Sequence, residues 1–337
     1  MDYQNNLTNK IQCTVCPRQC VLKNGQRGFC HVRQNIDGKI ILTSYGYNTG
    51  LSIDPIEKKP LYHFYPTSRV LSFGTVGCNL GCKFCQNWNT SKSKINPEKL
   101  NKTSPELIAY LTKKHKCKSV AFTYNEPTIF LEYAIDTAKA CKELGIKTVA
   151  VSAGYINPEP RAELFKYIDA VNIDLKAFNN DFYKRNCMAS LEPVLDTIRY
   201  VKHETNAWLE LTTLLIEGEN DSELEIKSEC EWIVENLGEC VPVHFSAFHP
   251  SYKFNEKTAT KIPTLLKAIQ IAKSTGLKYV YAGNVSNIET STTYCKNCGK
   301  PIIIREGYYI AAYNLDENSR CEFCETKCDG HFENIFI

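Results

Sequence analysis

The segment from residue 77 to residue 85 reads Gly77-Cys78-Asn79-Leu80-Gly81-Cys82-Lys83-Phe84-Cys85 and contains three cysteines in the spacing C-x3-C-x2-C. Three thiolates can bind three irons of a [4Fe–4S] cluster and leave the fourth iron open. An open iron can bind a substrate or a cofactor, which a cluster ligated by four cysteines cannot do. Zinc sites and ordinary ferredoxin clusters also use closely spaced cysteines, so the rest of the sequence has to separate these alternatives.

The composition limits the function further. The chain has 337 residues, a formal net charge of +3 and 17 cysteines. The small charge argues against a nucleic-acid-binding stripe. No long apolar run appears and the amino terminus, MDYQNNLTNK, lacks the apolar core of a signal peptide, so we expect a cytoplasmic protein without membrane association. Because the cytosol is reducing, these clustered cysteines indicate metal or cluster ligation rather than disulfides.

The cysteines divide the chain into three expected regions. Residues 1–66 form an N-terminal Cys-rich segment, and residues 67–289 alternate strand-like and helix-like runs. Residues 290–337 form a C-terminal module with a second set of closely spaced cysteines. The sequence therefore predicts one large central domain with a small metal-binding module at each end.

The middle region predicts an α/β fold. Short, apolar, β-branched runs are typical of strands buried on both faces, and they lie at 70–74, 119–124, 147–152, 170–175, 208–216, 241–246 and 278–282. Helices are expected between them, at 105–114, 128–144, 158–165, 191–203, 221–237 and 264–275. This alternation implies parallel pairing. We expect a partial (β/α)6 TIM-like barrel rather than a doubly wound open sheet, because polar residues follow the carboxyl ends of successive strands.

These polar residues are the candidates for binding a cofactor at the barrel mouth. They are Asn125, Glu126, Ser152, Gly154, Asp174, Lys176, Thr212 and His249, with Phe84 from the cysteine segment. Structural roles stay open for several of them. Glu126 could instead cap the following helix, and Asp174 and Lys176 could form a structural ion pair. His249, like the nearby His244, could be an ordinary structural histidine.

Together these motifs resemble the radical S-adenosylmethionine (SAM) superfamily. Within it, the chain closely resembles the radical SAM component of the AmmeMemoRadiSam system, among the proteins that are similar to pyruvate formate-lyase-activating enzyme. The resemblance covers nearly the whole chain and is carried by Thr-Val-Gly-Cys-Asn-Leu-Gly-Cys-Lys-Phe-Cys-Gln-Asn-Trp, Thr-Tyr-Asn-Glu-Pro-Thr, Asn-Ile-Asp-Leu-Lys, Phe-His-Pro and Gly-Asn-Val. One departure is that Tyr124-Asn125-Glu126-Pro127 stands where the superfamily often has Gly-Gly-Glu-Pro, which holds the amino group of SAM.

The resemblance implies a radical SAM fold and an enzyme that uses a [4Fe–4S] cluster on Cys78, Cys82 and Cys85. Such an enzyme cleaves SAM reductively to methionine and a 5′-deoxyadenosyl radical, which takes hydrogen from a substrate that is a protein, an RNA or a small molecule. Memo-like and AMME-domain proteins are implied partners, and a flavodoxin or ferredoxin is the expected electron donor. The alternatives are a glycyl-radical enzyme activase and, from another class, a non-catalytic sensor or zinc-ribbon nucleic-acid binder.

The flanking cysteines predict two further metal sites. Cys13, Cys16, Cys20 and Cys30 can form a tetrahedral zinc site or a complete auxiliary cluster, which their spacing does not separate. In the tail, two C-x2-C pairs have an interval close to that of zinc ribbons, so we expect zinc on Cys295, Cys298, Cys321 and Cys324. Cys328 and His331 could replace one of these ligands, and Cys187 is a candidate radical relay.

Overall fold

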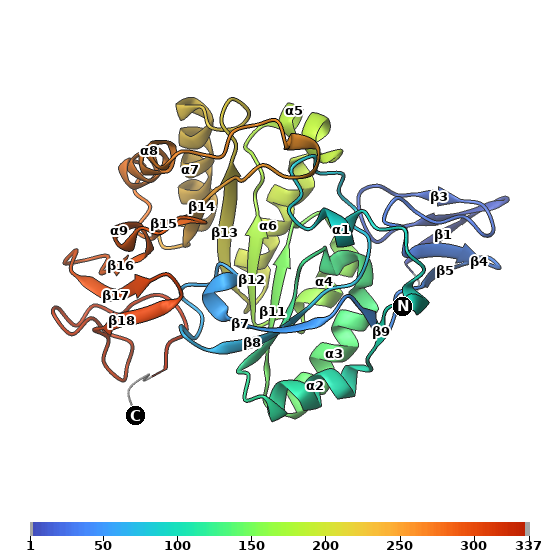
Figure 1. Ribbon diagram of the computed structural model, residues 1–337, viewed down its shortest axis with the longest axis horizontal. Helices are drawn as coiled ribbons and strands as arrows, with labels where there is room; N and C mark the ends of the chain where they lie inside the picture. Colours follow the sequence, from blue (N-terminus) through green and yellow to red (C-terminus); the bar gives the residue numbers. More distant parts are fainter. Residues whose placement is uncertain (1–2, 334–337) are drawn as a thin grey trace.

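The central element is an eight-stranded sheet in a computed structural model that describes residues 3–333. The spatial order is β15-β14-β13-β12-β11-β10-β8-β7, and every neighbouring pair except β7 with β8 is parallel (Figure 1). The strands are β7 (Leu51–Pro55), β8 (Arg69–Phe73), β10 (Ser119–Phe122), β11 (Lys147–Ser152), β12 (Ala170–Asp174), β13 (Trp208–Leu215), β14 (Val243–Ala247) and β15 (Val280–Gly283). The expected α/β fold with a parallel central sheet is confirmed, and the sheet remains open between β15 and β7.

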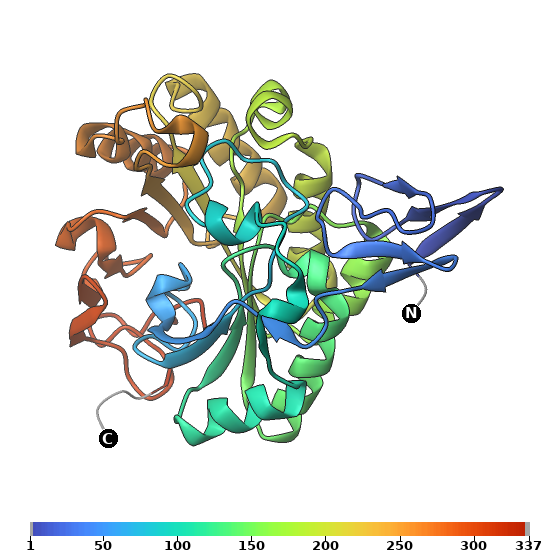
Figure 2. The same cartoon turned by 45° about the vertical axis from the view of Figure 1, so that its right-hand side comes forward.

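The helices that connect these strands lie outside the curved sheet (Figure 2). They are α2 (Pro105–Lys114), α3 (Leu131–Glu143), α4 (Pro158–Phe165), α6 (Glu192–Glu204), α7 (Glu223–Leu237) and α8 (Ile262–Ser274). Their starts follow local capping chemistry: the Ser104 hydroxyl accepts from the Leu107 N–H, and the Ser222 hydroxyl accepts from the Glu225 N–H. The helices expected from the sequence are therefore present, with ends shifted by a few residues.

Shorter elements complete the described chain. The helical ones are α1 (Trp88–Ser91), α5 (Asn180–Phe182), α9 (Ile288–Ser291), the 3₁₀ turns η1 (Ile56–Lys58), η2 (Pro97–Lys99), η3 (Pro127–Phe130) and η5 (Tyr252–Phe254), and the π-helical turn η4 (Tyr183–Cys187). The remaining strands are β1 (Gln4–Leu7), β2 (Lys10–Cys13), β3 (Val21–Leu22), β4 (Arg33–Ile36), β5 (Lys39–Leu42), β6 (Tyr47–Asn48), β9 (Asn101–Lys102), β16 (Thr293–Tyr294), β17 (Pro301–Glu306) and β18 (Tyr309–Tyr313).

The N-terminal strands project from one end of the molecule and the C-terminal strands lie at the other (Figure 1). β1 to β3 form one small antiparallel sheet, and β4 pairs with β5. Arg33, which is buried, anchors this end: its guanidinium binds both carboxylate oxygens of Glu132 on α3 at 2.5 and 2.7 Å and donates to the Ile129 carbonyl. The N-terminal module is thereby fastened to the central domain.

The boundary expected near residue 66 does not coincide with the edge of the sheet. β7 lies within the expected N-terminal region, yet it pairs with β8 as an antiparallel edge strand. The segment from residue 51 onward therefore belongs to the central sheet. The sequence does not predict this strand, because a short edge strand has one exposed face and lacks the continuous apolar run of the central strands.

The C-terminal module packs against both edges of the open sheet. Tyr62, which follows β7, and Tyr281 on β15 contact each other with ring centroids 4.7 Å apart, and both pack in one apolar cluster with β17 residues such as Ile303. The fully buried Arg305 donates to the carbonyl oxygens of Ser291 and Tyr62 and to the Thr293 hydroxyl. These contacts close the side of the barrel that the sheet leaves open.

No helix within residues 3–333 has both the length and the apolar character that crossing a bilayer requires.

A buried carboxyl group in the core predicts a pH effect on stability. Glu229 on α7 accepts a hydrogen bond from Thr213, and its burial raises its pKa from 4.5 to about 8. Between these pH values the unfolded chain releases a proton that the folded protein keeps, so the free energy of unfolding falls as the pH rises, by up to about 1.4 kcal/mol per unit. We expect Glu229→Gln to remove this fall and to raise the melting temperature at pH 8 more than at pH 5.

Thermal unfolding of wild type and variant between pH 5 and 8 measures this difference. Glu235→Gln, an exposed position on the same helix, is the control and should leave the slope as in the wild type. If the melting temperatures of the Glu229 variant and the wild type changed equally with pH across this range, the assigned role of burial would be contradicted.

Candidate active site at the strand ends

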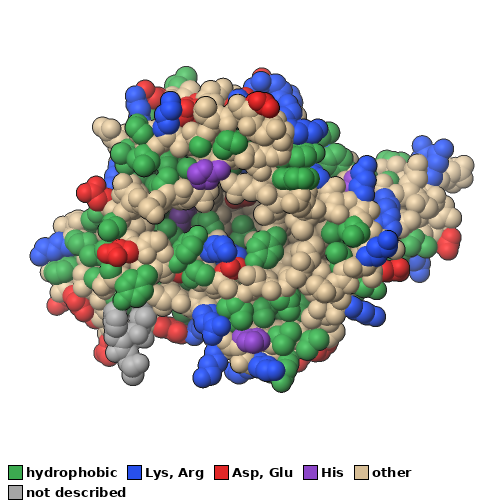
Figure 3. Space-filling view, viewed as in Figure 1, with side chains coloured by type: hydrophobic (Ala, Val, Ile, Leu, Met, Phe, Trp, Pro, Cys, Tyr) green, Lys and Arg blue, Asp and Glu red, His purple; other side chains and the backbone are tan. Residues whose placement is uncertain are grey.

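A cavity of about 410 Å³ opens at the carboxyl ends of the parallel strands. Figure 3 shows the molecule hollowed near the centre of this face. The expected site residues that line the cavity are Cys78, Cys82, Cys85, Phe84, Asn125, Glu126, Ser152, Asp174, Lys176 and Thr212. They come from the loop after β8 and from the ends of β10 to β13, which the parallel topology brings to one face.

Two glycines between β8 and Cys78 allow the backbone to pass close to neighbouring segments, where a side chain would not fit. A Cβ on Gly74 would lie 2.3 Å from the Thr123 carbonyl oxygen, and a Cβ on Gly77 would lie 2.0 Å from the Cys30 carbonyl oxygen. Farther along, the Gly81 N–H donates to the Cys187 carbonyl at 2.7 Å. The loop backbone is therefore held on several sides before any metal binds.

Asn125 holds the same loop through its side chain. Its amide donates to the Thr75 hydroxyl at 3.0 Å and to the Gly77 carbonyl at 3.1 Å, and its carbonyl oxygen accepts from the Thr75 N–H. These three hydrogen bonds fasten the end of β10 to the residues just before Cys78. In this structure Asn125 is a positioning residue for the cysteine loop.

Glu126 is almost completely buried, with 2 % of its surface exposed. One carboxylate oxygen accepts from the N–H and the hydroxyl of Thr128 and from the Ser152 hydroxyl, while the other accepts from the Ala153 N–H at 2.7 Å. Burial raises the pKa of Glu126, and these donors oppose that rise. Glu126 thus caps η3, as the structural alternative stated, and it also joins the ends of β10 and β11.

Tyr124 stands where the radical SAM enzymes that this chain resembles often have a glycine, and its backbone takes a left-handed conformation with φ of +68°. This conformation costs a non-glycine residue about 1–2 kcal/mol. The tyrosine hydroxyl donates to Asp54 at 3.0 Å, and Asp54 also binds Lys59 at 2.8 Å. The side chain therefore has anchors that a glycine would lack, and these offset the backbone strain.

Asp174 and Lys176 form an ion pair of 2.9 Å within the cavity wall. Burial lowers the pKa of the Lys176 ammonium, but Asp174 and the sulfurs of Cys82 and Cys187 outweigh this effect, so the net shift is upward. Lys176 consequently remains a cation at the edge of the cysteine loop. The ion pair that was expected as an alternative is present, and both side chains also face the cavity.

Thr212 places an unpartnered hydroxyl at the cavity wall. Its hydroxyl oxygen is buried at the cavity wall and has no hydrogen-bond partner among the described residues. An unpaired buried hydroxyl is unfavourable, so a polar group of a bound molecule is the natural partner. The adjacent Thr213 points to the opposite face of β13 and binds Glu229.

Two expected cofactor residues do not line this cavity. Gly154 has φ of +65° and packs against Ile173 and Val194, so it forms a turn behind the wall. His249 lies in a neighbouring shallow depression with Gln86 and Asn284, two residues that also reach the main cavity. The strand pattern predicts that both residues lie near the strand ends, but it does not show which residues there line the cavity.

His244 and Glu210 form a buried structural site away from the cavity. The His244 ring is 2.7 Å from a Glu210 oxygen, and the same carboxylate accepts from the N–H groups of Tyr62 and His63 and from the Trp208 indole. Four donors therefore satisfy Glu210. This residue ties β13 to the segment after β7 and leaves His244 with a structural role.

Other cavity residues have no local sequence signal. They are Lys58, Lys59, Lys92 and Tyr308. Lys92 donates to the Leu80 carbonyl inside the cysteine loop, and Tyr308 comes from the turn between β17 and β18. Because these residues lie far apart along the chain, only the docking of η1 and of the C-terminal module brings them to the cavity.

Cys187 is the fourth cysteine beside the loop. Its thiol is in hydrogen-bonding contact with the Cys82 thiol, and its side chain is fully buried. Cys187 is not part of the cavity lining, whereas Cys78, Cys82 and Cys85 are. The arrangement thus offers three thiols to the cavity, as a cluster with one open iron requires.

The tail contains a separate, closely packed cysteine site. The ligand atoms of Cys295, Cys298, Cys321 and Cys324 all lie within 4.8 Å of one another. Two sulfur pairs are 3.5 and 3.8 Å apart. Cys328 instead contacts the Tyr279 hydroxyl, and His331 packs against Phe64, so neither joins this group. Four converging thiols can bind a metal ion.

Comparisons with known proteins agree with this geometry. Residues 73–228 match the model of the radical SAM superfamily. The chain is 42% identical to an uncharacterised Methanocaldococcus jannaschii protein, MJ0808, over 98% of both chains. It is 34% identical to the pyruvate formate-lyase-activating enzyme of Clostridium pasteurianum over 32% of this chain and 46% of that enzyme. A putative glycyl-radical enzyme activating enzyme of M. jannaschii is 28% identical over 63% of this chain and 78% of that protein.

Solved structures show the same fold at low sequence identity. A radical SAM methyltransferase from Sphaerobacter thermophilus superposes with a TM-score of 0.52 and 15% identity, covering 71% of each chain. Streptococcus suis SuiB bound to S-adenosylmethionine superposes with a TM-score of 0.50 and 15% identity, covering 68% of this chain and 53% of that one. These similarities concern the architecture of the central domain.

Proposed function

Because the chain belongs to the radical SAM superfamily, in one family with the Methanocaldococcus protein MJ0808, we propose that its cavity binds a [4Fe–4S] cluster and SAM. Cys78, Cys82 and Cys85 would bind three irons. The observation that carries the proposal is a cavity with three thiols on one wall and the unpartnered Thr212 hydroxyl on another. A cluster held by these cysteines would supply the electron for reductive cleavage of SAM to methionine and a 5′-deoxyadenosyl radical.

The residues of the chain prepare this site. Asn125 positions the cysteine loop through its hydrogen bonds, and Glu126 links the end of β10 to the end of β11. The Asp174–Lys176 pair offers an anionic and a cationic group to the charged ends of SAM. Thr212 would bond a hydroxyl or carboxylate of the cofactor. The enclosed walls orient the substrate and exclude water from a reactive radical.

The test of this proposal is anaerobic. Purified protein reconstituted with iron and sulfide is mixed with SAM and dithionite, and 5′-deoxyadenosine is quantified. Accumulation of 5′-deoxyadenosine that depends on both iron and dithionite is the expected outcome. A fully loaded protein that leaves SAM intact would refute the proposal and favour a non-catalytic cluster protein.

Thr212→Val tests the binding of SAM. Valine has nearly the same shape but cannot donate or accept, so a hydrogen bond of about 1–1.5 kcal/mol disappears and the KM for SAM should rise about tenfold with a small change in kcat. Thr213→Val is the matched control, because it lies next in the chain and faces away from the cavity. An unchanged KM in the Thr212 variant would remove this residue from the SAM site.

A second candidate is an activase that takes hydrogen from a glycine of a partner protein. Its support is the identity with activating enzymes whose names state that activity. Memo-like and AMME-domain proteins are the partners that the resemblance suggests, with flavodoxin or ferredoxin as donor. A glycyl-radical signal on a partner after incubation with the loaded enzyme favours this candidate, and turnover of a small molecule or RNA without one argues against it.

We also propose that Cys295, Cys298, Cys321 and Cys324 bind zinc. Tetrahedral zinc with Zn–S bonds of about 2.3 Å places its sulfurs about 3.8 Å apart. The sulfur pairs at 3.5 and 3.8 Å match that spacing. The module packs against both edges of the sheet, so this zinc would stabilise the wall from which Tyr308 reaches the cavity.

A further inference from the structure

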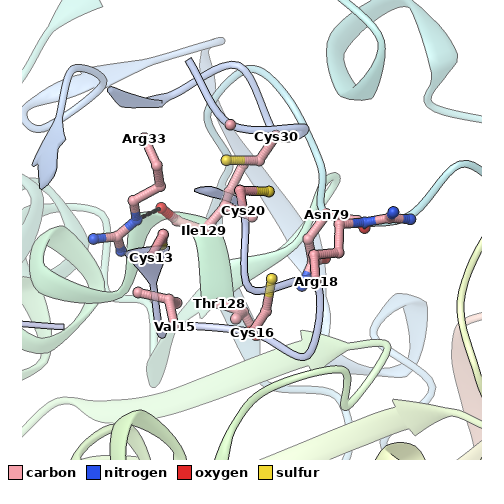
Figure 4. A pocket seen from close by; sticks show the side chains of 11 residues that line it. Cys13, Val15, Cys16, Arg18, Cys20, Cys30, Arg33, Asn79, Thr128 and Ile129 are labelled. Carbon is pink, nitrogen blue, oxygen red and sulfur yellow. Dashed lines mark hydrogen bonds between the residues drawn. The ribbon is translucent and has the colours of Figure 1, made fainter. Parts of the chain in front are cut away.

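A second cysteine cavity lies between the N-terminal module and the central domain (Figure 4). Its wall contains Cys13, Cys16, Cys20 and Cys30. Figure 4 shows Cys16 on one side of this space and Cys20 and Cys30 opposite it, with Arg33 and Asn79 at two other sides. The four residues come from β2 and from the two loops that follow it, so the small sheets of the module serve to bring these thiols together.

The Cys20 sulfur accepts a hydrogen bond from the backbone N–H of Phe29 at 3.5 Å. Backbone donors stabilise the negative charge of thiolates and are a standard part of the surroundings of metal-bound cysteines. The Phe29 N–H would stabilise Cys20 as a thiolate ligand.

The separation of the sulfurs distinguishes this site from the C-terminal one. In the described part of the chain, the C-terminal cysteines form the group whose ligand atoms converge within 4.8 Å, and the N-terminal cysteines do not form such a group. They line a separate cavity between the N-terminal module and the central domain instead. A single zinc ion needs sulfurs about 3.8 Å apart. A cubane cluster is larger and holds its four thiolates farther apart.

The charges around the cavity suit an anionic group. Arg18 lies at the wall and donates to the carbonyl oxygens of Asn79 and Met188 rather than to a carboxylate. Arg33 lines the same cavity from the other side, where Glu132 balances its charge. A [4Fe–4S] cluster with four thiolates is a net anion, so the Arg18 guanidinium would stabilise it.

The cavity is also in direct contact with the loop that carries Cys78. Asn79 lines this cavity, and its side-chain carbonyl oxygen is 4.0 Å from the Cys78 sulfur. On the other side of Cys78, the Gly77 backbone touches the Cys30 carbonyl so closely that a Cβ would not fit. A group bound by the N-terminal cysteines would thus lie next to the loop that carries Cys78.

We propose that Cys13, Cys16, Cys20 and Cys30 bind a second [4Fe–4S] cluster, fully ligated by protein and adjacent to the cavity at the strand ends. Because all four irons have a cysteine, this cluster has no open position for SAM. The site rests on its own cysteines and stands whether or not the proposed SAM chemistry is correct. Zinc, which the sequence left as an alternative for this module, is assigned to the tail alone.

Counting metals in three anaerobically prepared proteins tests the assignment. The wild type should hold about eight irons and eight sulfides per chain, the Cys16→Ser/Cys20→Ser variant about four, and the Cys78→Ala/Cys82→Ala/Cys85→Ala variant about four, because each complete cluster contributes four. Zinc should be about one per chain in all three proteins. The iron left in the triple variant reports on the N-terminal site even if the enzyme never cleaves SAM.

Electron paramagnetic resonance of the dithionite-reduced proteins tests the adjacency. Two neighbouring paramagnetic clusters broaden each other's signals, so the wild-type spectrum should be broader than that of either variant. Cys240→Ser, outside both cavities, is the control and should keep the wild-type iron content. About four irons and two zincs in the wild type, with one zinc lost in the Cys16/Cys20 variant, would overturn the proposal, as would an iron-free triple variant that is folded by circular dichroism.

Discussion

Replacing Cys82 with alanine should abolish the formation of 5′-deoxyadenosine from SAM, whereas replacing Cys187 should preserve it. The two thiols touch each other and both are buried, but only Cys82 belongs to the cavity lining. Changes to residues that merely support a metal ligand reduce metal affinity or activity 10- to 100-fold, so loss of a ligand itself should reduce the rate by more than about a hundredfold.

The measurement combines product quantification with iron analysis. Cys82→Ala should lose the iron of this cavity while zinc in the tail and the melting temperature change little. Cys187→Ala should retain both iron and product, because its thiol lies behind the loop. Undiminished product from the Cys82 variant would show that the loop does not hold the catalytic cluster. Loss of product in the Cys187 variant at full iron content would instead support a direct role of Cys187 in the reaction.

Gly77→Ala should disrupt both cysteine sites at once. Its φ of +86° disfavours any side chain, and the added Cβ would lie 2.0 Å from the backbone of Cys30. The left-handed conformation costs about 1–2 kcal/mol, and overpacking adds about 1–3 kcal/mol, so the free energy of unfolding should fall by about 2–5 kcal/mol. Because the clash separates Cys30 from the loop before Cys78, iron content should fall as well.

Gly145→Ala is the matched control for the cost of placing a side chain on a residue in the left-handed conformation. Its φ is +69° and nothing lies within 4 Å of the added Cβ, so it should cost only the conformational part and leave iron unchanged. Thermal unfolding and iron analysis of the two variants separate strain from steric conflict. Equal losses in both variants would mean that the contact between the N-terminal module and the cysteine loop does not matter.

Much of the fold was predictable from local patterns. The seven parallel strands and the helices between them were located from apolar runs, caps and glycine stops, because the central sheet is buried on both faces and each signal is short-range. The edge strand β7 was not found, since its apolar residues Leu51 and Ile53 are exposed on one face. The placement of the C-terminal module against Tyr62 and Tyr281 was not found either, because it depends on contacts between distant segments.

Most of the candidate site was also predictable, but the orientation of several side chains was not. Residues at strand ends reach the same face by topology, which explains why Asp174 and Thr212 line one cavity. Gly154 and His249 occur at similar positions in the pattern but lie outside the cavity: Gly154, with φ of +65°, lies beside Ile173, and His249 lines the neighbouring depression. Lys59 and Tyr308 were missed because no spacing links them to the strand ends.

The sequence by itself determined the chemistry that the chain offers: three cysteines in one loop, four in the N-terminal segment, two C-x2-C pairs in the tail, and polar residues after parallel strands. These properties depend on residue type and local spacing, which the linear order states directly. Only the tertiary structure decided how far apart the sulfurs of each group lie and which of them face one another. That distance depends on how separate loops pack, and here it gives the tail a site for one ion and the N-terminal module a wider one beside Cys78.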